Sequence, residues 1–331
     1  MLITKTPFRV SFCGGGSDMA VFYEKYGGCV LSTSFNKYMY ISIHPYFNEN
    51  QTLLKYSENE RVNNIQEIKH RIFHQVLSDM QVSGVEISST ADVPEGTGLG
   101  SSSTFTVGLL HTLYSYKGKF ASKAKLAREA CEVEIEKLSS PIGKQDQYAA
   151  AFGGLNFIRF NQDGSVSVAP IMMQAETYKR LEKNLLMFYT GTTRSANTIL
   201  SEQKKNISQS DKNENLKKMC KLAEQMKESL EQNDLSLFGT ILNQSWELKR
   251  TLASGISNPE IDRAYMVALD SGALGGKLLG AGGGGFLLFY CEPEQQKELR
   301  RNIGQIGLKE FEFRFEQDGT SIVYIGDKYW R

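Results

Sequence analysis

The segment Val85-Glu-Ile-Ser-Ser-Thr-Ala-Asp-Val-Pro94-Glu-Gly96-Thr-Gly98-Leu-Gly100-Ser101-Ser102-Ser103 is the most informative stretch of the chain. Residues 84–89 predict a strand, the glycines predict a loop, and an apolar helix is expected over 101–117. A helix start offers unpaired backbone N–H groups and the positive end of a dipole, which favour a bound phosphate. The segment is neither a Walker A loop nor a G-x-G-x-x-G motif. It therefore predicts a phosphate-binding loop that differs from both of these motifs.

The residues expected to contact phosphate form the turn and the start of the helix: Pro94, Gly96, Thr97, Gly98, Leu99, Gly100, Ser101, Ser102 and Ser103. Glycines let successive N–H groups converge on one anion. The serine hydroxyls can cap the helix or coordinate Mg²⁺. A plain helix cap would need one serine and no glycines, so phosphate binding is the favoured interpretation.

Outside this loop, strands and helices alternate without a regular period. Residues rich in β-branched and aromatic side chains predict strands over 2–9, 38–44, 155–160, 185–189 and 285–290, with two more near the C-terminus. Apolar residues at helical spacing predict helices over 62–80 and 122–138, a long helical region from 195 to about 254, and a helix after Asn258-Pro259. The pattern indicates an α+β fold in two lobes, with domains at 1–175 and 176–331.

Composition excludes several classes of protein. The 331 residues carry 38 Lys and Arg against 37 Asp and Glu, a net charge of +1, which argues against nucleic-acid or polybasic membrane binding. No run approaches the roughly 20 apolar residues of a membrane span, and no signal peptide is expected. Five scattered cysteines without a CxxC pair favour a reducing compartment. We expect a cytoplasmic globular protein with no nucleic-acid or membrane partner.

A second segment, Glu134 to Gly154, combines an acidic helix, a Ser-Ser-Pro-Ile-Gly break and an aspartate, Asp146, before small residues. Kinases need one carboxylate on Mg²⁺ and one near the attacking hydroxyl. Glu134 and Asp146 can supply these, although a solvated acidic face is the simpler interpretation of the helix alone.

A third segment, Gly275 to Phe286, is predicted to be a strand, a glycine loop and a second strand. It can form a tight hairpin, or it can close over a phosphate or a sugar from the second lobe.

Three stretches of the chain resemble, in order and spacing, the three motifs of the GHMP small-molecule kinases. The first motif is Pro7-Phe-Arg9-Val-Ser-Phe-Cys-Gly14-Gly-Gly-Ser17-Asp18, the second Pro94 to Ser103, and the third Lys277 to Phe286. The stretch Gly143-Lys-Gln-Asp146-Gln-Tyr-Ala also resembles the galactokinase segment that carries the catalytic aspartate. The resemblance implies an N-terminal lobe with a left-handed βαβ crossover, a ferredoxin-like C-terminal lobe, and a substrate between them.

The resemblance also implies roles for individual residues, with ATP and Mg²⁺ as cofactors. Asp146 and Arg9 would be catalytic, and Ser102 and Glu134 would hold Mg²⁺, with Glu136 as an alternative ligand two residues on. The expected sugar contacts lie in three loops: Gly15, Gly16, Ser17 and Asp18; Thr193 and Arg194; and Gly282 and Gly283.

The triple glycine followed by Ser17-Asp18 is similar to the first motif of the D-glycero-D-manno-heptose 7-phosphate kinases and of the related fucokinase-type enzymes. The implied reaction is phosphorylation of the anomeric hydroxyl of the heptose 7-phosphate to the 1,7-bisphosphate, for nucleotide-activated heptose and surface polysaccharide. Arg194 would grip the second phosphate, because arginine pairs with phosphate in a forked geometry; a surface ion pair is its simpler explanation.

Two alternatives stay open at this stage. One is an anomeric kinase for a free sugar of the L-fucose or galactose type, and the other is a non-catalytic sugar sensor on the same fold. The partner is expected to be a small sugar phosphate, and the chain a monomer or a homodimer.

Overall fold

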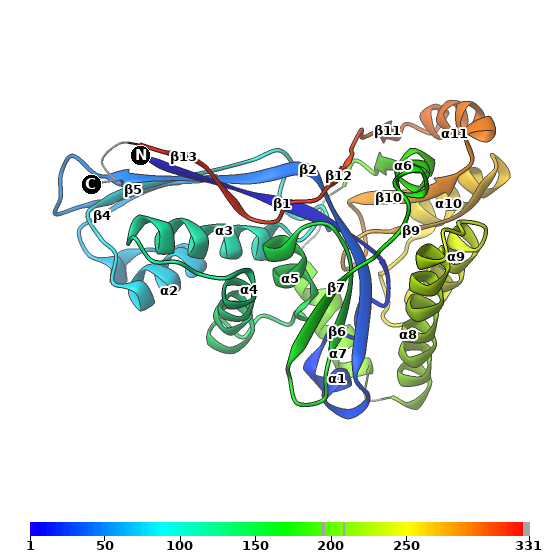
Figure 1. The fold of residues 1–331 in the computed structure, drawn as a ribbon, viewed down its shortest axis with the longest axis horizontal. Coiled ribbons are helices and arrows are strands. Elements are labelled where there is room, and N and C mark those ends of the chain that lie inside the picture. Colours follow the sequence, from blue (N-terminus) through cyan, green and yellow to red (C-terminus); the bar gives the residue numbers. More distant parts are fainter. Residues whose placement is uncertain (193–195, 208, 327–331) are drawn as a thin grey trace.

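A computed structural model describes residues 1–192, 196–207 and 209–326, and the strands of these residues form two sheets (Figure 1). The larger sheet contains β1 (Leu2–Cys13), β2 (Gly28–Pro45), β3 (Thr52–Lys55), β4 (Asn59–Val62), β5 (Val85–Ala91), β6 (Leu155–Phe160), β7 (Val166–Pro170), β12 (Phe315–Glu316) and β13 (Ser321–Ile325). The smaller sheet contains β8 (Leu185–Tyr189), β9 (Ala273–Leu278), β10 (Phe286–Cys291) and β11 (Lys309–Glu310).

The 18-residue strand β2 organises the larger sheet. Its first half pairs with β6, its second half pairs with β5, and β1 pairs along most of its length. Strands β3 and β5 are parallel and are joined through β4 and α2, so the sheet contains a βαβ unit. The short helix α1 (Ala20–Tyr26) links β1 to β2.

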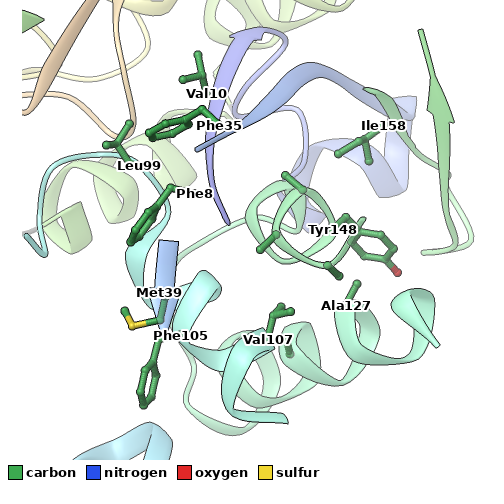
Figure 2. Close-up of a cluster of buried hydrophobic side chains, with 14 of the residues drawn as sticks. Phe8, Val10, Phe35, Met39, Leu99, Phe105, Val107, Ala127, Tyr148 and Ile158 are labelled. Atoms are coloured by element: carbon green, nitrogen blue, oxygen red, sulfur yellow. The ribbon is translucent and has the colours of Figure 1, made fainter. Parts of the chain in front are cut away.

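Helices cover one face of this sheet: α2 (Arg71–Met80), α3 (Ser101–Tyr116), α4 (Lys123–Cys131) and α5 (Gln145–Phe152) (Figure 1). Helix α3 lies at the centre and is buried nearly all round from Ser103 to Leu113, polar residues included. Figure 2 shows Phe105 and Val107 of this helix in one cluster with Phe8, Phe35 and Tyr148. The buried contacts of α3 thus position the end of the loop that precedes it.

The smaller sheet has the order β11-β8-β10-β9, and all its pairs are antiparallel. When these four strands are renumbered 1 to 4 along the chain, the order is 4-1-3-2, which is that of a ferredoxin-like sheet. The predicted two-lobe α+β fold is therefore confirmed. The helices of this part are α6 (Ala175–Asn184), α7 (Ala196–Asn206), α8 (Ser210–Glu231), α9 (Phe238–Lys249), α10 (Pro259–Asp270) and α11 (Pro293–Gln305). Trp246 of α9 and Phe289 of β10 are fully buried in its core.

The last strands return to the larger sheet. β12 pairs with β2, and β13 pairs with β1, so both strands belong to the sheet of the N-terminal lobe. The N–H of Gly326 donates to the carbonyl of Met1 at 2.9 Å. The boundary at 175/176 stays a prediction.

Two predicted helices are shorter than expected. The stretch 62–80 is interrupted because Asn64 caps a 3₁₀ turn and His70 caps α2, its ring nitrogen accepting the N–H of Phe73 at 3.3 Å. The stretch 122–138 changes from α-helix to π-helix at Glu132–Lys137. In the described residues no helix has the length and apolar character needed to cross a bilayer.

Candidate functional site

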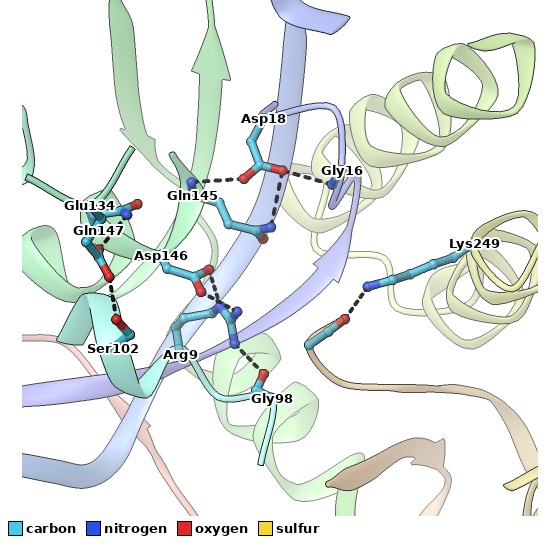
Figure 3. Close-up of polar contacts among 11 residues, drawn as sticks. Arg9, Gly16, Asp18, Gly98, Ser102, Glu134, Gln145, Asp146, Gln147 and Lys249 are labelled. Atoms are coloured by element: carbon cyan, nitrogen blue, oxygen red, sulfur yellow. Dashed lines mark hydrogen bonds and ion pairs between the residues drawn. The ribbon is translucent and has the colours of Figure 1, made fainter. Parts of the chain in front are cut away.

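An ion pair between the first strand and helix α5 forms the centre of the candidate site (Figure 3). Arg9 Nε and Nη2 donate to the two carboxylate oxygens of Asp146 at 2.8 and 2.7 Å. Arg9 Nη1 donates to the carbonyl of Gly98 at 2.7 Å. Arg9 follows a register shift after Pro7, which lacks the N–H that a regular ladder would use. The forked contact fixes the Asp146 carboxylate in one orientation.

Beside this pair, a second buried carboxylate bridges two helices. Ser102 Oγ donates to Glu134 Oε1 at 2.5 Å, and Gln147 Nε2 donates to Glu134 Oε2 at 2.7 Å. Burial raises the pKa of Glu134 to about 7. Glu136, the alternative ligand, is exposed on the same π-helical turn. Glu134 is thus on the buried side of this π-helix, and π-helical turns are often found at functional sites.

The phosphate-loop prediction is supported by an open helix start. Gly96, Gly98 and Gly100 have φ of 77°, 81° and 80°, a left-handed conformation that glycine adopts without strain. Gly100 is the N-cap of α3, and no side chain caps the helix. Ser101 Oγ is buried without a partner in the described residues. Free N–H groups and an unsatisfied hydroxyl at a helix start fit an anionic ligand.

The third motif packs directly on this loop. A Cβ on Gly280 would lie 2.3 Å from Gly98 Cα, and one on Gly285 would lie 2.3 Å from the Thr97 carbonyl. Gly283 donates its N–H to the carbonyl of Ile256 at 3.0 Å, and Gly282 also packs against that residue. The two glycine loops therefore meet backbone to backbone, which side chains would prevent.

Asp18, on the turn that follows β1, lies near Asp146 (Figure 3). Its carboxylate accepts hydrogen bonds from the N–H of Gly16 at 2.8 Å, the N–H of Gln145 at 3.1 Å and Gln145 Nε2 at 3.2 Å. Burial, and then the Asp146 charge, raise the pKa of Asp18. The structure thus places the first motif next to α5.

The rest of the Gly14–Asp18 turn is buried. The Ser17 hydroxyl donates to the carbonyl of Gly14 at 2.8 Å and accepts the N–H of Cys29 at 3.0 Å, so it braces the loop. Gly15 packs on the side chain of Gln145. Thr193 and Arg194, the predicted grip on a second phosphate, lie outside the described residues.

Sequence reasoning missed two buried lysines. Lys249, the last residue of α9, donates to the carbonyl of Gly280 at 2.6 Å, and burial followed by the Arg9 charge lowers its pKa to about 8. Lys277 of β9 donates to the carbonyl of Phe12 at 3.1 Å, and burial lowers its pKa well below the ordinary value. No sequence signal marks a lysine as buried, although Lys277 begins the third motif.

The oxygen ligands present fit a magnesium ion bound together with a nucleotide. Mg²⁺ takes one or two protein oxygens and completes its shell with phosphate and water. The Ser102 hydroxyl and the Glu134 carboxylate are such ligands, 2.5 Å apart. The described residues contain no group of three or more His, Cys, Asp or Glu side chains that would make an all-protein metal cage.

Two family models and several known proteins match this chain. The family model for the GHMP kinases N terminal domain matches residues 63–154, and the model for GHMP kinases C terminal matches residues 226–307. The D-glycero-alpha-D-manno-heptose 7-phosphate kinase of Campylobacter jejuni is 30% identical over 99% of this chain and 98% of its own length.

Two further relatives differ in how much of their length matches. The bifunctional fucokinase/GDP-fucose pyrophosphorylase of Arabidopsis thaliana is 28% identical over 67% of this chain and 21% of its own. A crystal structure of a D-glycero-D-manno-heptose 1-phosphate kinase from Bacteroides thetaiotaomicron superposes with a TM-score of 0.80 at 26% identity, over 99% of this chain and 100% of that one.

Proposed function

This chain belongs to the GHMP kinase family and is a sugar kinase, and we propose that it phosphorylates the anomeric hydroxyl of D-glycero-D-manno-heptose 7-phosphate. The phosphoryl donor is ATP, which the kinases of this family use, and the product is the 1,7-bisphosphate. The product would serve nucleotide-activated heptose and surface polysaccharide synthesis. The choice of substrate rests on the D-glycero-alpha-D-manno-heptose 7-phosphate kinase of Campylobacter jejuni, to which this chain is similar over its full length.

One observation carries the chemistry. The forked Arg9–Asp146 pair lies beside the uncapped start of α3, and Arg9 also holds the Gly98 carbonyl of the loop. A carboxylate, a cation and an anion-binding helix start within hydrogen-bonded contact are the parts that phosphoryl transfer requires.

In the proposed mechanism, Asp146 orients the sugar hydroxyl and accepts its proton. Because aspartate is a weak base, positioning and charge stabilisation supply most of the rate. Arg9 holds the carboxylate and balances charge on the transferring phosphoryl group. Ser102 and Glu134 would hold Mg²⁺, which would neutralise the β- and γ-phosphates.

The loop from Pro94 to Ser103 would cradle the triphosphate through its N–H groups. Asp18 would accept hydrogen bonds from sugar hydroxyls, while the turn that it ends supplies shape. Gly282 and Gly283 would close over the substrate from the C-terminal lobe. Thr193 and Arg194 would bind the 7-phosphate.

The alternative substrate is a free sugar, and the fucokinase-type relative is the finding that favours it. A sensor without activity has no such support, because the family and its relatives are kinases. A cytoplasmic location, a monomer or homodimer, and domains at 1–175 and 176–331 complete the proposal.

The test is coupled ADP release with Mg·ATP against heptose 7-phosphate, mannose, L-fucose, galactose and mevalonate. Turnover confined to the 7-phosphate supports the proposal, and Arg194→Ala should then raise KM for that substrate alone. Asp146→Asn is the matched inactive control. Turnover only on a free sugar, or on mevalonate, would refute the substrate assignment.

A further inference from the structure

Lys249 reaches the candidate site from the C-terminal lobe. Figure 3 shows its side chain extending from α9 toward Arg9 and Asp146, which come from the opposite lobe. The side chain is 7% exposed. Its ammonium has three N–H donors, and in the described part of the chain the carbonyl of Gly280 is the hydrogen-bond partner seen, at 2.6 Å. Two donors therefore remain for a ligand.

The neighbouring carboxylates do not balance this charge. Asp146 is engaged by Arg9 through both oxygens, and Asp18 accepts three hydrogen bonds from Gly16 and Gln145. Among the described residues no ion pair joins Lys249 to either of them within 4.0 Å. The charges that act on Lys249 are Arg9 first, by repulsion, and then the two aspartates. A buried ammonium beside another cation is unfavourable unless an anion joins them.

Lys277 adds to the positive potential behind Lys249. It is fully buried, donates to the Phe12 carbonyl at 3.1 Å, and is repelled by both Lys249 and Arg9. Three basic side chains thus gather in this part of the interior, where Asp18 and Asp146 are the carboxylates that act on Lys249. Lys277 is too enclosed to contact a ligand, so its effect on one is electrostatic.

The position of Lys249 points to one anion in particular. The carbonyl that it holds belongs to Gly280, which packs on Gly98, and Gly98 is bonded to Arg9 just before the start of α3. An anion bound at that helix start and beside Arg9 would therefore lie next to the free donors of Lys249.

We propose that Lys249 is a further catalytic residue, a cation from the C-terminal lobe that contacts the oxygens of the transferring phosphoryl group opposite Arg9. In the reaction the sugar hydroxyl oxygen forms a bond to the γ-phosphorus, and the bond from that phosphorus to the β–γ bridging oxygen breaks, with its electron pair leaving on ADP. The hydroxyl proton passes to Asp146. Lys249 stabilises negative charge on the transferring group from the side opposite Arg9, while Asp146 acts on the acceptor hydroxyl. This inference rests on the proposed Asp146 mechanism and not on the identity of the sugar.

The experiment compares Lys249→Met, Lys249→Gln and Lys249→Arg with the exposed control Lys297→Met. We expect kcat to fall about 100-fold or more in Lys249→Met, as when one donor to a developing charge is removed. Lys249→Gln keeps a donor for Gly280 without the charge and should behave like Met, whereas Lys249→Arg should recover part of the rate. Lys297→Met should match the wild type.

A second measurement needs no sugar and no turnover. ADP with Mg²⁺ and aluminium fluoride mimics the transferring phosphoryl group, and its affinity is compared with that of ADP alone by calorimetry. In the wild type, aluminium fluoride should increase the affinity for ADP. In Lys249→Met this increase should be at least tenfold smaller, while the affinity for ADP alone changes less than twofold. A wild-type protein that phosphorylates none of the sugars would refute the substrate proposal alone. The aluminium fluoride measurement would still test the role of Lys249.

Three results would overturn the inference. The first is an unchanged gain from aluminium fluoride in Lys249→Met. The second is a rise in KM confined to phosphorylated sugars with kcat unchanged, which would make Lys249 an acceptor-phosphate residue. The third is a large fall in melting temperature in Lys249→Met, which would show that Lys249 mainly stabilises the Gly280 loop. If the proposal is right, removal of this buried charge leaves the stability equal or higher.

Discussion

Replacing Glu134 with glutamine should change how the stability of the unliganded chain depends on pH. The pKa of this buried carboxyl is raised from 4.5 to about 7, mainly by burial. The folded state therefore holds a proton that the unfolded state releases, and the free energy of unfolding falls as pH rises from about 4.5 to 7. A shift of about 2.5 units at 1.36 kcal/mol each gives about 3 kcal/mol.

Glu134→Gln removes that loss. The amide has nearly the shape of the protonated acid, and the Ser102 hydroxyl can turn to accept its N–H. We expect equal stability of wild type and variant at pH 4, below the unfolded-state pKa, and at pH 8 a variant more stable by about 3 kcal/mol, or about 4 °C in melting temperature for 331 residues. Calorimetry without metal or nucleotide at both pH values measures this, with Glu136→Gln as the exposed control.

The reasoning would be refuted by pH profiles that run parallel for wild type and Glu134→Gln. It would equally be refuted if Glu136→Gln showed the same gain at pH 8, because the effect would then be one of net charge and not of burial.

Three further perturbations test other parts of the site. Gly280→Ala places a Cβ 2.3 Å from Gly98 Cα at φ 77°, so we expect a melting temperature lower by several degrees and weaker ADP binding, whereas Gly304→Ala, with open space around it, should be neutral or stabilising. Ser102→Ala should raise the Mg²⁺ concentration for half-maximal rate about tenfold, measured at saturating ATP, and an unchanged value would remove Ser102 from the metal site. Arg9→Met frees the Asp146 carboxylate, so kcat should fall about 100-fold or more in steady-state assays while the melting temperature changes little.

The sequence predicts the site best where local chemistry decides the backbone. The glycine loop ending at Gly100, the helix that follows it, and the strand Leu185–Tyr189 are found where the residues place them. Each depends on short-range properties, which are glycine conformation, helix capping and β-branched or aromatic content.

What the sequence does not predict depends on the tertiary structure. No local residue preference marks the π turn on which Glu134 is buried, and in helix α6 (Ala175–Asn184) two of the three buried residues, Thr177 and Asn184, are polar. Lys249 reads as an ordinary polar helix end, and only the arrival of Gly280 and Arg9 from other parts of the chain makes it a buried cation.

The pairing of β12 and β13 with the larger sheet affects how the chain is synthesised and folded. Until β13 (Ser321–Ile325) has left the ribosome, the edge of β1 that it will cover has no partner, so the N-terminal lobe emerges incomplete. Contacts between Leu2 and Ile325 are among the longest in sequence separation that the chain can make, and such contacts slow folding. A nascent chain stalled before residue 315 should therefore be sensitive to protease and to edge-to-edge association, and should become resistant only when the last two strands are released.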